Sequence, residues 1–491
     1  EQKGLVLGAY EGCEPGELIL TPAAQKFDCQ VNGKLTDLIK GSRLKAGKAL
    51  CFGNLSEDYY EVAVAGLGPE GQGFDSLEHM DMCREDIRAA AGAGARALQE
   101  RGCQVVHVEG FTNAEAAAEG ATLGVWKYQE LKDPPDRLII PKLELYDSED
   151  ADGWMHGTLK ADNQNVARRL EESPANIMTP AIFAQNCIEL LCPCGVQVDV
   201  KGLEWLETQK MIAFLSIAKG SCEPPLFVEL SYCGGDMDEK PVGITYDSGG
   251  IDLKPDNAQL IECRGDMCGA AVVVAVIRAA AQMRLPINLR GLLPLCENMI
   301  GGLSVKPGDV VVGMNGKSIR LEHTDNEGRV ILADALTYSS VHKPCLIINV
   351  ADFQTGIKDS MGTTCTGVFS TSPEIWEELR SAGAITGDRV WRFPLWKFYA
   401  NGVTDFPEVD VNNVGKAKGG DPCYAAAFLM EFVPPVDFVH MDISGTGMLS
   451  AGIEFPYLRR GTMSGRPTRT LIQFLYQLAC PHQPPQCAPP C

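Results

Sequence analysis

The sequence has no uninterrupted run of about 18 apolar residues, the length that a membrane-spanning helix needs. It also shows no apolar segment of the kind found in secretory signals. Positive charge is scarce, because 43 Lys and Arg stand against 64 Asp and Glu, and the formal net charge is −21. We therefore expect no transmembrane insertion and no secretion. Nucleic acid and anionic membrane surfaces are also poor partners for so acidic a chain.

The spacing of cysteines that is typical of structural zinc sites is missing as well, although cysteine is abundant. The chain has 19 Cys but no CxxC pair, and Cys192 and Cys194 stand too close together for a usual pair of ligands. Most cysteines lie inside apolar runs, as Cys51, Cys187 and Cys296 do. Such cysteines behave as small hydrophobic residues, so we expect buried free thiols in a reducing compartment.

The last residues differ in character from the rest of the chain. Residues 479–491 are rich in proline and contain Cys480, Cys487 and Cys491. Proline keeps such a segment extended and hydrated. The three cysteines are therefore candidates for cross-links between neighbouring chains.

What the sequence does contain is an alternation of strand-like apolar runs with Ala-rich helical stretches, one of them over residues 114–131. The alternation occupies residues 1–150, is interrupted by a helical stretch over 151–172, and resumes over 173–478, before the tail at 479–491. It predicts an α/β protein with a small N-terminal domain, a linking helix and a larger C-terminal domain. The larger domain should hold a mixed, mostly parallel sheet with its sites at the carboxyl ends of strands.

Three short acidic segments with neighbouring glycines follow predicted strands. They are YDSGG with Asp247, RGDMCGA with Asp266, and HTDNEGR with Asp325 and Glu327. If the last segment is extended, its two acids point the same way. Any one segment alone is typical of turns and helix starts. The three together favour a site where carboxylates bind paired divalent ions, because converging carboxylates repel unless cations neutralise them.

On these residues the chain resembles the M17 leucyl aminopeptidases over nearly its whole length, to about Leu478. The blocks that carry the resemblance are GLVLG, SPANIMTP, GITYDSGG, DMCGAA, PLCENM, KPGDVV, HTDNEGRVILADAL, TGDRVWRFPL and GRPTRTL. The resemblance implies a metallopeptidase fold that removes N-terminal residues from peptides with two divalent ions per subunit, usually zinc or manganese. It also implies a hexamer built as a dimer of trimers.

The resemblance assigns roles to single residues. The four carboxylate metal ligands correspond to Asp247, Asp266, Asp325 and Glu327. The lysine that polarises the substrate carbonyl corresponds to Lys254. The arginine that holds a bicarbonate ion as proton shuttle corresponds to Arg329.

One metal ligand of the family is missing. Its ligand lysine corresponds to Val242, which has no donor atom. Loss of a direct ligand should cost more than the roughly 10–100-fold in affinity that loss of an outer partner costs. Lys240 is an alternative donor, because on a strand it faces the same side about 6–7 Å away.

Further departures cluster around the expected substrate. The pocket methionine is Cys263, the second glycine of the DMGG block is Cys268, and two signature positions hold His323 and Asn326. The loop whose backbone contacts the peptide in the family has changed at Asp352, Phe353, Gln354 and Thr355. The substrate pocket should therefore be remodelled.

These departures resemble those of leucyl-aminopeptidase-like paralogues of insect sperm. They imply a structural component of the sperm mitochondrial derivative, with little or no peptidase activity. We then expect one metal ion or none, a bicarbonate site at Arg329, a homohexamer or a mixed hexamer with paralogues, and a possible higher-order assembly. The location would be mitochondrial or cytoplasmic. The alternative is an active metal-dependent aminopeptidase.

Overall fold

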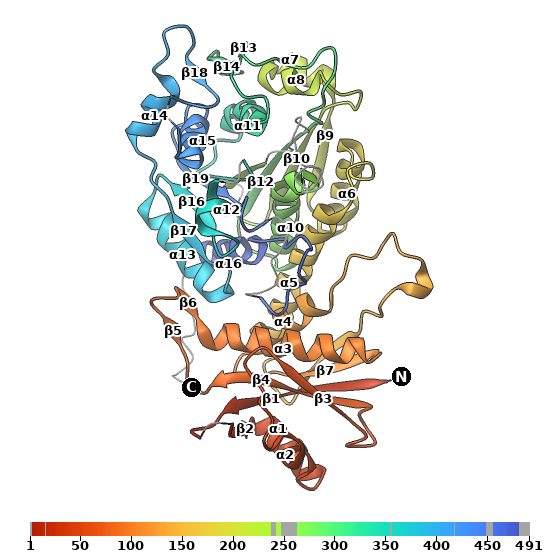
Figure 1. The fold of residues 1–491 in the computed structure, drawn as a ribbon. Coiled ribbons are helices and arrows are strands. Elements are labelled where there is room, and N and C mark those ends of the chain that lie inside the picture. The colour runs from red at the N-terminus through yellow and green to blue at the C-terminus, as the bar shows by residue number, and fades with distance from the viewer. Residues whose placement is uncertain are drawn as a thin grey trace.

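The computed structural model describes residues 2–14, 16–236, 242–246, 263–353, 356–416, 418–447 and 455–480. These residues form two large sheets, the first from strands between Lys3 and Tyr146 and the second from strands between Gln197 and Asp442. Figure 1 shows the first sheet at one end of the molecule, with α3 (Met82–Glu100) and α4 (Ala114–Val125) between it and the larger part. The α/β fold with a small N-terminal domain and a larger C-terminal domain is confirmed.

The first sheet has the strand order β3-β4-β1-β7-β8, with β2 paired to β1. Its strands are β1 (Lys3–Glu11), β2 (Leu18–Leu20), β3 (Ala49–Gly53), β4 (Glu61–Pro69), β7 (Val105–Glu109) and β8 (Lys142–Tyr146). The central strand β1 is parallel to both its neighbours and is buried on both faces. Its side chains alternate between two cores, because Leu5 packs in the same cluster as Phe27 whereas Val6 packs in the same cluster as Ile87.

The helices beside this sheet are α1 (Pro22–Gln30), α2 (Lys34–Ile39), α3, α4 and the short 3₁₀ turn η1 (Pro134–Asp136). Polar side chains cap the starts of α1, α3 and α4. The side chain of Asp81 accepts the N–H of Arg84 at the start of α3, and Asn113 accepts that of Ala116 at the start of α4. The helical stretch that the sequence suggests up to Leu131 ends earlier, at Val125.

The second sheet has eight strands in the order β17-β16-β19-β15-β11-β12-β10-β9. Its strands are β9 (Gln197–Lys201), β10 (Leu226–Cys233), β11 (Val242–Tyr246), β12 (Asn288–Leu295), β15 (Leu346–Ala351), β16 (Thr366–Ser370), β17 (Val390–Arg392) and β19 (Asp437–Asp442). The central strands β12, β11, β15 and β19 are mutually parallel. Antiparallel pairs join β9 to β10, β10 to β12 and β16 to β19, so the sheet is mixed, as predicted.

Helices cover both faces of this sheet (Figure 1). They and the 3₁₀ turns are α5 (Ala151–Glu172), α6 (Pro180–Leu191), η2 (Cys192–Cys194), α7 (Leu203–Thr208), α8 (Ile212–Ala218), η3 (Cys263–Met267), α10 (Cys268–Gln282), α11 (Glu327–Tyr338), η4 (Ser339–His342), α12 (Gly356–Met361), α13 (Pro373–Thr386), α14 (Lys397–Thr404), α15 (Asp421–Met430) and α16 (Thr468–Ala479). Smaller strands form the β5 (Phe74–Asp75) and β6 (Met80–Asp81) ribbon and the sheet of β13 (Asp309–Val312), β14 (Ser318–Leu321) and β18 (Val411–Asn412).

The central helix α10 is long, apolar and mostly buried. By length and composition alone the stretch Arg264–Gln282 could cross a membrane, although the sequence shows no uninterrupted apolar run of that length. Its most apolar window is 78% buried inside the fold. Val and Ala side chains of α10 pack into the main core against the sheet, as expected of a core helix.

Candidate metal centre

The carboxyl ends of three parallel strands lie at one edge of the second sheet. Tyr246 at the end of β11 is in register with Val350 of β15, and Ala351 of β15 is in register with Asp442 of β19. Side chains that follow these strands are therefore neighbours, as open α/β sheets place their sites. Asp352, which directly follows β15, comes to this edge.

Asp266 lies on η3, the short 3₁₀ turn that leads into α10. Cys268, the first residue of α10, has no solvent exposure. Burial first, and then the negative charge of Asp352, raise the pKa of its thiol well above the usual value. Asp266 adds to this shift, so both acids lie within electrostatic reach of one buried sulfur.

Asp325 and Glu327 do not lie in an extended segment, so the expectation that extended backbone points both the same way does not apply. Asp325 lies in a turn, and Glu327 is the first residue of α11 with 4% exposure. The turn forms because the N–H of Asn326 donates to the carbonyl of His323 at 3.3 Å. The ring Nδ1 of His323 also accepts the N–H of Asp325 at 3.2 Å. His323 thus shapes the turn that carries the acids.

Arg329 lies two residues further along α11 and is 2% exposed. Its Nη1 donates to the carbonyl oxygen of Asn413 at 2.7 Å. The guanidinium carbon lies 5.7 Å from the ring centre of Phe353, within reach of a cation–π contact. Phe353 is itself 8% exposed. Arg329 is therefore held from two sides, one of them by a residue that departs from the family pattern.

A buried histidine at this edge was missed by the sequence reasoning. The ring of His440 on β19 stacks between Phe353 at 4.9 Å and Phe369 at 5.6 Å, centre to centre. Its Nδ1 shares a 2.7 Å hydrogen bond with Oδ1 of Asn349. Burial, with a smaller effect of Arg329, lowers the pKa of His440 to about 3, so the ring is neutral. Its only signal in the sequence was a polar residue inside an apolar strand.

Asp442, at the end of β19, was also missed. Its Oδ1 accepts the backbone N–H of Ser444 at 3.1 Å. Complete burial raises the pKa of this carboxyl to about 6, although the bonds from Ser444 and the charge of Arg329 oppose the shift. Asp442 thus adds a second titratable group beside the arginine.

Val242 begins β11 and is 3% exposed. It is in register with Leu289 of β12 and Leu346 of β15. All three belong to the main hydrophobic core, together with the side chains of α10. The position that would supply a nitrogen ligand is thus part of an aliphatic cluster.

The donor chemistry decides which ion the described residues fit. Carboxylate oxygens at Asp266, Asp325 and Glu327 suit manganese, magnesium or zinc. No nitrogen donor comes from Val242. Among the residues that the structure describes, no group of three or more His, Cys, Asp or Glu side chains is close enough to hold an ion by itself. The described acids therefore supply oxygen donors, but they do not form an ion site by themselves.

Several predicted residues lie outside the described ranges. They are Asp247, Lys254, Lys240, Gln354 and Thr355, with Cys487 and Cys491 of the tail. Cys263 lies on η3 by its backbone. Their proposed roles stay predictions.

Known proteins match this chain over most of its length. Residues 165–472 match the cytosol aminopeptidase family, catalytic domain, and residues 6–135 match the N-terminal domain of the same family. The cytosol aminopeptidase of Bos taurus is 46% identical over 488 residues, covering 97% of this chain and 93% of that protein. The cytosol aminopeptidase of Dictyostelium discoideum is 35% identical, covering 96% of this chain and 92% of that protein.

A solved structure agrees with these matches. The bottromycin maturation enzyme BotP in complex with Mn superposes with a TM-score of 0.81 at 28% sequence identity. The match covers 97% of this chain and 99% of that one.

Proposed function

The chain belongs to the cytosol aminopeptidase family, and from that premise we propose that it is a member with an impaired metal centre and little or no peptidase activity. It keeps the aminopeptidase fold and uses that fold in a structural role. The departures from the family pattern favour the sperm mitochondrial derivative as the place of that role.

The observation that carries the proposal is the packing of Val242. A lysine at this position would supply the nitrogen ligand of the family's site, whereas the valine fills an aliphatic core between β12 and β15. A core position of this kind resists a charged replacement, because burying a cation without a partner is costly. The change is therefore built into the packing of the sheet.

The remaining groups keep part of the chemistry. A divalent ion, when bound, polarises a substrate carbonyl and lowers the pKa of a bound water. In this chain Asp266, Asp325 and Glu327 would supply oxygen ligands. Arg329, fixed by the carbonyl of Asn413 at 2.7 Å, would present a positive charge to a bicarbonate or another anion. The centre thus keeps acids and an arginine but lacks the nitrogen donor.

An active metal-dependent aminopeptidase is the second candidate. It is favoured by the retention of Glu327 and Arg329 at the start of α11 and by the 46% identity to the bovine cytosol aminopeptidase. In this alternative the carboxylates alone hold enough metal for turnover.

Hydrolysis of leucyl-p-nitroanilide separates the two candidates. Purified protein with added manganese or zinc should show turnover at least about 100-fold below a family member that has the ligand lysine, since an outer-ligand loss alone costs roughly 10–100-fold in affinity or activity. The bovine relative, assayed in parallel, is the positive control. Turnover comparable to that control at saturating metal would establish the active enzyme and contradict the structural role.

We further propose a hexameric assembly, a dimer of trimers made of this chain alone or mixed with paralogues, in mitochondria or cytoplasm. Cross-links through the tail cysteines would stabilise a higher-order array. Non-reducing electrophoresis should show disulfide-linked oligomers of the chain, and these should vanish when Cys480, Cys487 and Cys491 are replaced. Sedimentation of the reduced protein as a monomer would contradict the hexamer.

A further inference from the structure

Helix α5 is long and lies inside the fold, and most of a row of polar side chains along it is therefore buried. They recur at helical spacing and face elements of both halves of the molecule. The buried members of the row are Lys160, Gln164, Arg168 and Glu171, and the partly exposed Glu172 ends it. Buried polar groups need hydrogen-bond partners, so the contacts of this row identify the elements that α5 connects.

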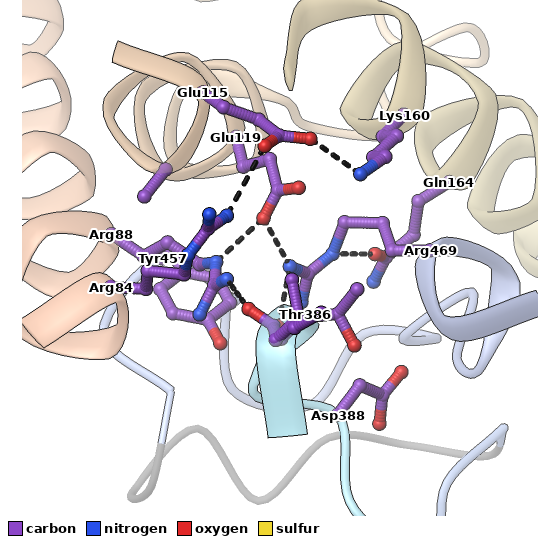
Figure 2. Close-up of polar contacts among 12 residues, drawn as sticks. Arg84, Arg88, Glu115, Glu119, Lys160, Gln164, Thr386, Asp388, Tyr457 and Arg469 are labelled. Atoms are coloured by element: carbon purple, nitrogen blue, oxygen red, sulfur yellow. Dashed lines mark hydrogen bonds and ion pairs between the residues drawn. The ribbon is translucent and has the colours of Figure 1, made fainter. Parts of the chain in front are cut away.

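The first half of the row binds the N-terminal half and α16. Lys160 donates to Oε1 of Glu115 on α4 at 2.5 Å and to Oε1 of Gln473 on α16 at 2.6 Å. Oε1 of Gln164 accepts Nε of Arg469 at 2.6 Å. Figure 2 shows Lys160 facing Glu115 and Gln164 facing Arg469 across the space between the helices.

The second half of the row binds the segment that precedes α16. Nε of Arg168 donates to the carbonyl of Met463 at 3.2 Å. Oε2 of Glu171 accepts the N–H of Gly465 at 3.1 Å. Gln164 also donates to the carbonyl of Ser464 at 2.7 Å. Residues 463–465 are therefore fixed on α5 through their backbone.

Glu172, the last residue of α5, uses its two oxygens for two different elements. Oε2 accepts the backbone N–H of Met463 at 2.7 Å. Oε1 accepts Nη2 of Arg264 on η3 at 3.0 Å. The two side chains of this ion pair are only 13% and 20% exposed. The pair is therefore screened by water less than an ordinary surface pair.

Arg264 stands two residues before Asp266 on the same five-residue 3₁₀ turn. Such a turn has few internal hydrogen bonds, and their geometry is poorer than in an α-helix. Contacts made by its side chains therefore contribute much to its placement. We propose that Glu172 is a positioning residue of the metal centre, which fixes the turn bearing Asp266 to α5 through Arg264. This inference rests on the assignment of Asp266 to the metal centre under the proposed function.

The substitution Glu172→Gln tests the proposal with little change in shape. Arg264 and the N–H of Met463 use different oxygens of Glu172, so in glutamine one of these two donors faces an NH2 group, and the negative charge that pairs with Arg264 is lost. The matched control is Glu377→Gln, because Glu377 pairs with Arg380 at 2.7 Å on the exposed side of α13, away from η3. Arg264→Met removes the other partner of the pair.

Two measurements follow on these full-length variants. The first is manganese titration followed by the paramagnetic resonance of free Mn²⁺. We expect Glu172→Gln and Arg264→Met each to weaken binding roughly 10-fold or more, as loss of a partner behind a metal ligand does. The double variant should bind no more weakly than the weaker of the two single variants, because both act through the contact between Glu172 and Arg264. Glu377→Gln should bind as the unchanged protein does.

The second measurement needs no metal. Cys268 follows η3 directly and is fully buried, so its alkylation by iodoacetamide in metal-free protein reports how firmly the turn is held. Peptide mass spectrometry should show faster labelling of Cys268 in Glu172→Gln, with Cys187 in the core of α6 as the internal reference.

The outcomes separate the inference from the proposed function. Manganese binding unchanged in Glu172→Gln, or additive losses in the double variant, would overturn the positioning role. If the unchanged protein binds no manganese, the metal part of the proposed function fails, and the labelling of Cys268 decides the inference. Labelling at the unchanged rate then overturns it, whereas faster labelling in Glu172→Gln and Arg264→Met alike supports it.

Discussion

Two charged regions of the molecule differ in how their charges are balanced. Between the N-terminal half and the larger part, Arg88 and Arg469 both donate to Oε2 of the buried Glu119, at 2.6 and 2.7 Å (Figure 2). At the candidate metal centre, acids lie on η3 and at the start of α11, and the position expected to supply a nitrogen donor holds Val242. The first region pairs its charges within the chain, whereas the second is the region that we propose binds a cation.

Under the proposed function, this difference would make stability and metal chemistry separable in this fold. The buried network ties α3, α4, α13 and α16 together and needs no bound ion. Arg469, for example, also donates to the carbonyl of Thr386 at the end of α13 at 2.8 Å. Loss of a metal ligand at the other region leaves these contacts untouched. A family member can therefore keep its architecture while its catalytic centre decays.

The largest effect should come from breaking the network at its shared acid. Glu119→Gln removes the negative charge on which Arg88 and Arg469 converge, and leaves two cations buried with one carboxylate fewer. We expect a loss of about 3–5 kcal/mol in the free energy of unfolding. Urea denaturation followed by circular dichroism measures it. A loss below about 1 kcal/mol would show that the network does not hold the halves together.

The next largest effect should be the dependence on pH of the stability that Glu115 contributes to the same network. Burial by itself would raise the pKa of Glu115, but the charges of Lys160 and Arg84 outweigh it and lower the pKa to about 2. The folded pKa lies below the unfolded value, so this stabilisation is complete above about pH 4.5 and is lost as pH falls towards 2. It amounts to about 3 kcal/mol.

Unfolding of the unchanged protein and of Glu115→Gln should be compared from pH 7 to pH 3. The difference in unfolding free energy should stay constant down to about pH 4.5 and shrink below it. A difference that instead grows on acidification would mean that the sign of the pKa shift is wrong.

At the metal centre a smaller effect is expected from Phe353→Leu. The leucine lacks the ring that stacks on His440 at 4.9 Å and contacts the guanidinium of Arg329. We expect a loss of about 1 kcal/mol, because an aromatic pair contributes about that much beyond the area it buries. Thermal unfolding measures it. An unchanged midpoint would show that the stack does not anchor the loop after β15.

The smallest effect should be seen at an exposed ion pair. Glu377→Gln breaks a contact with Arg380 in which both side chains are largely in water. We expect a change below about 0.5 kcal/mol, since water screens such pairs and ordering two long side chains costs entropy. A loss as large as that of Glu119→Gln would remove the distinction between buried and exposed charges.

The sequence predicted most elements because their signal is local. Parallel strands such as β1 and β15 are nearly continuous apolar runs, since both of their faces are covered. The periodicity over 151–172 matches α5 (Ala151–Glu172). The end of α4 was placed too late, because Trp126 takes extended backbone and packs under Arg168, 4.1 Å from its ring centre. That contact comes from another helix, so the sequence around Trp126 gives no sign of it.

The polar contacts were much harder to predict. Glu119 and Arg469 are 350 residues apart, and no spacing in the sequence relates them. The turn before α11 was read as extended, because the pairing of His323 with Asp325 depends on a side-chain nitrogen and not on periodicity. The assignment of Asp266, Asp325 and Glu327 came from a family motif, and Val242 was singled out as a departure from it.

We propose that the missing nitrogen donor at Val242 impairs the metal centre, and manganese titration of Val242→Lys tests this most directly. Val242→Met, which lengthens the side chain without adding a nitrogen, is the control. The lysine variant should bind manganese at least about 10-fold more tightly than the unchanged protein and the methionine control. Equal affinity in all three proteins, with the fold intact by circular dichroism, would contradict it.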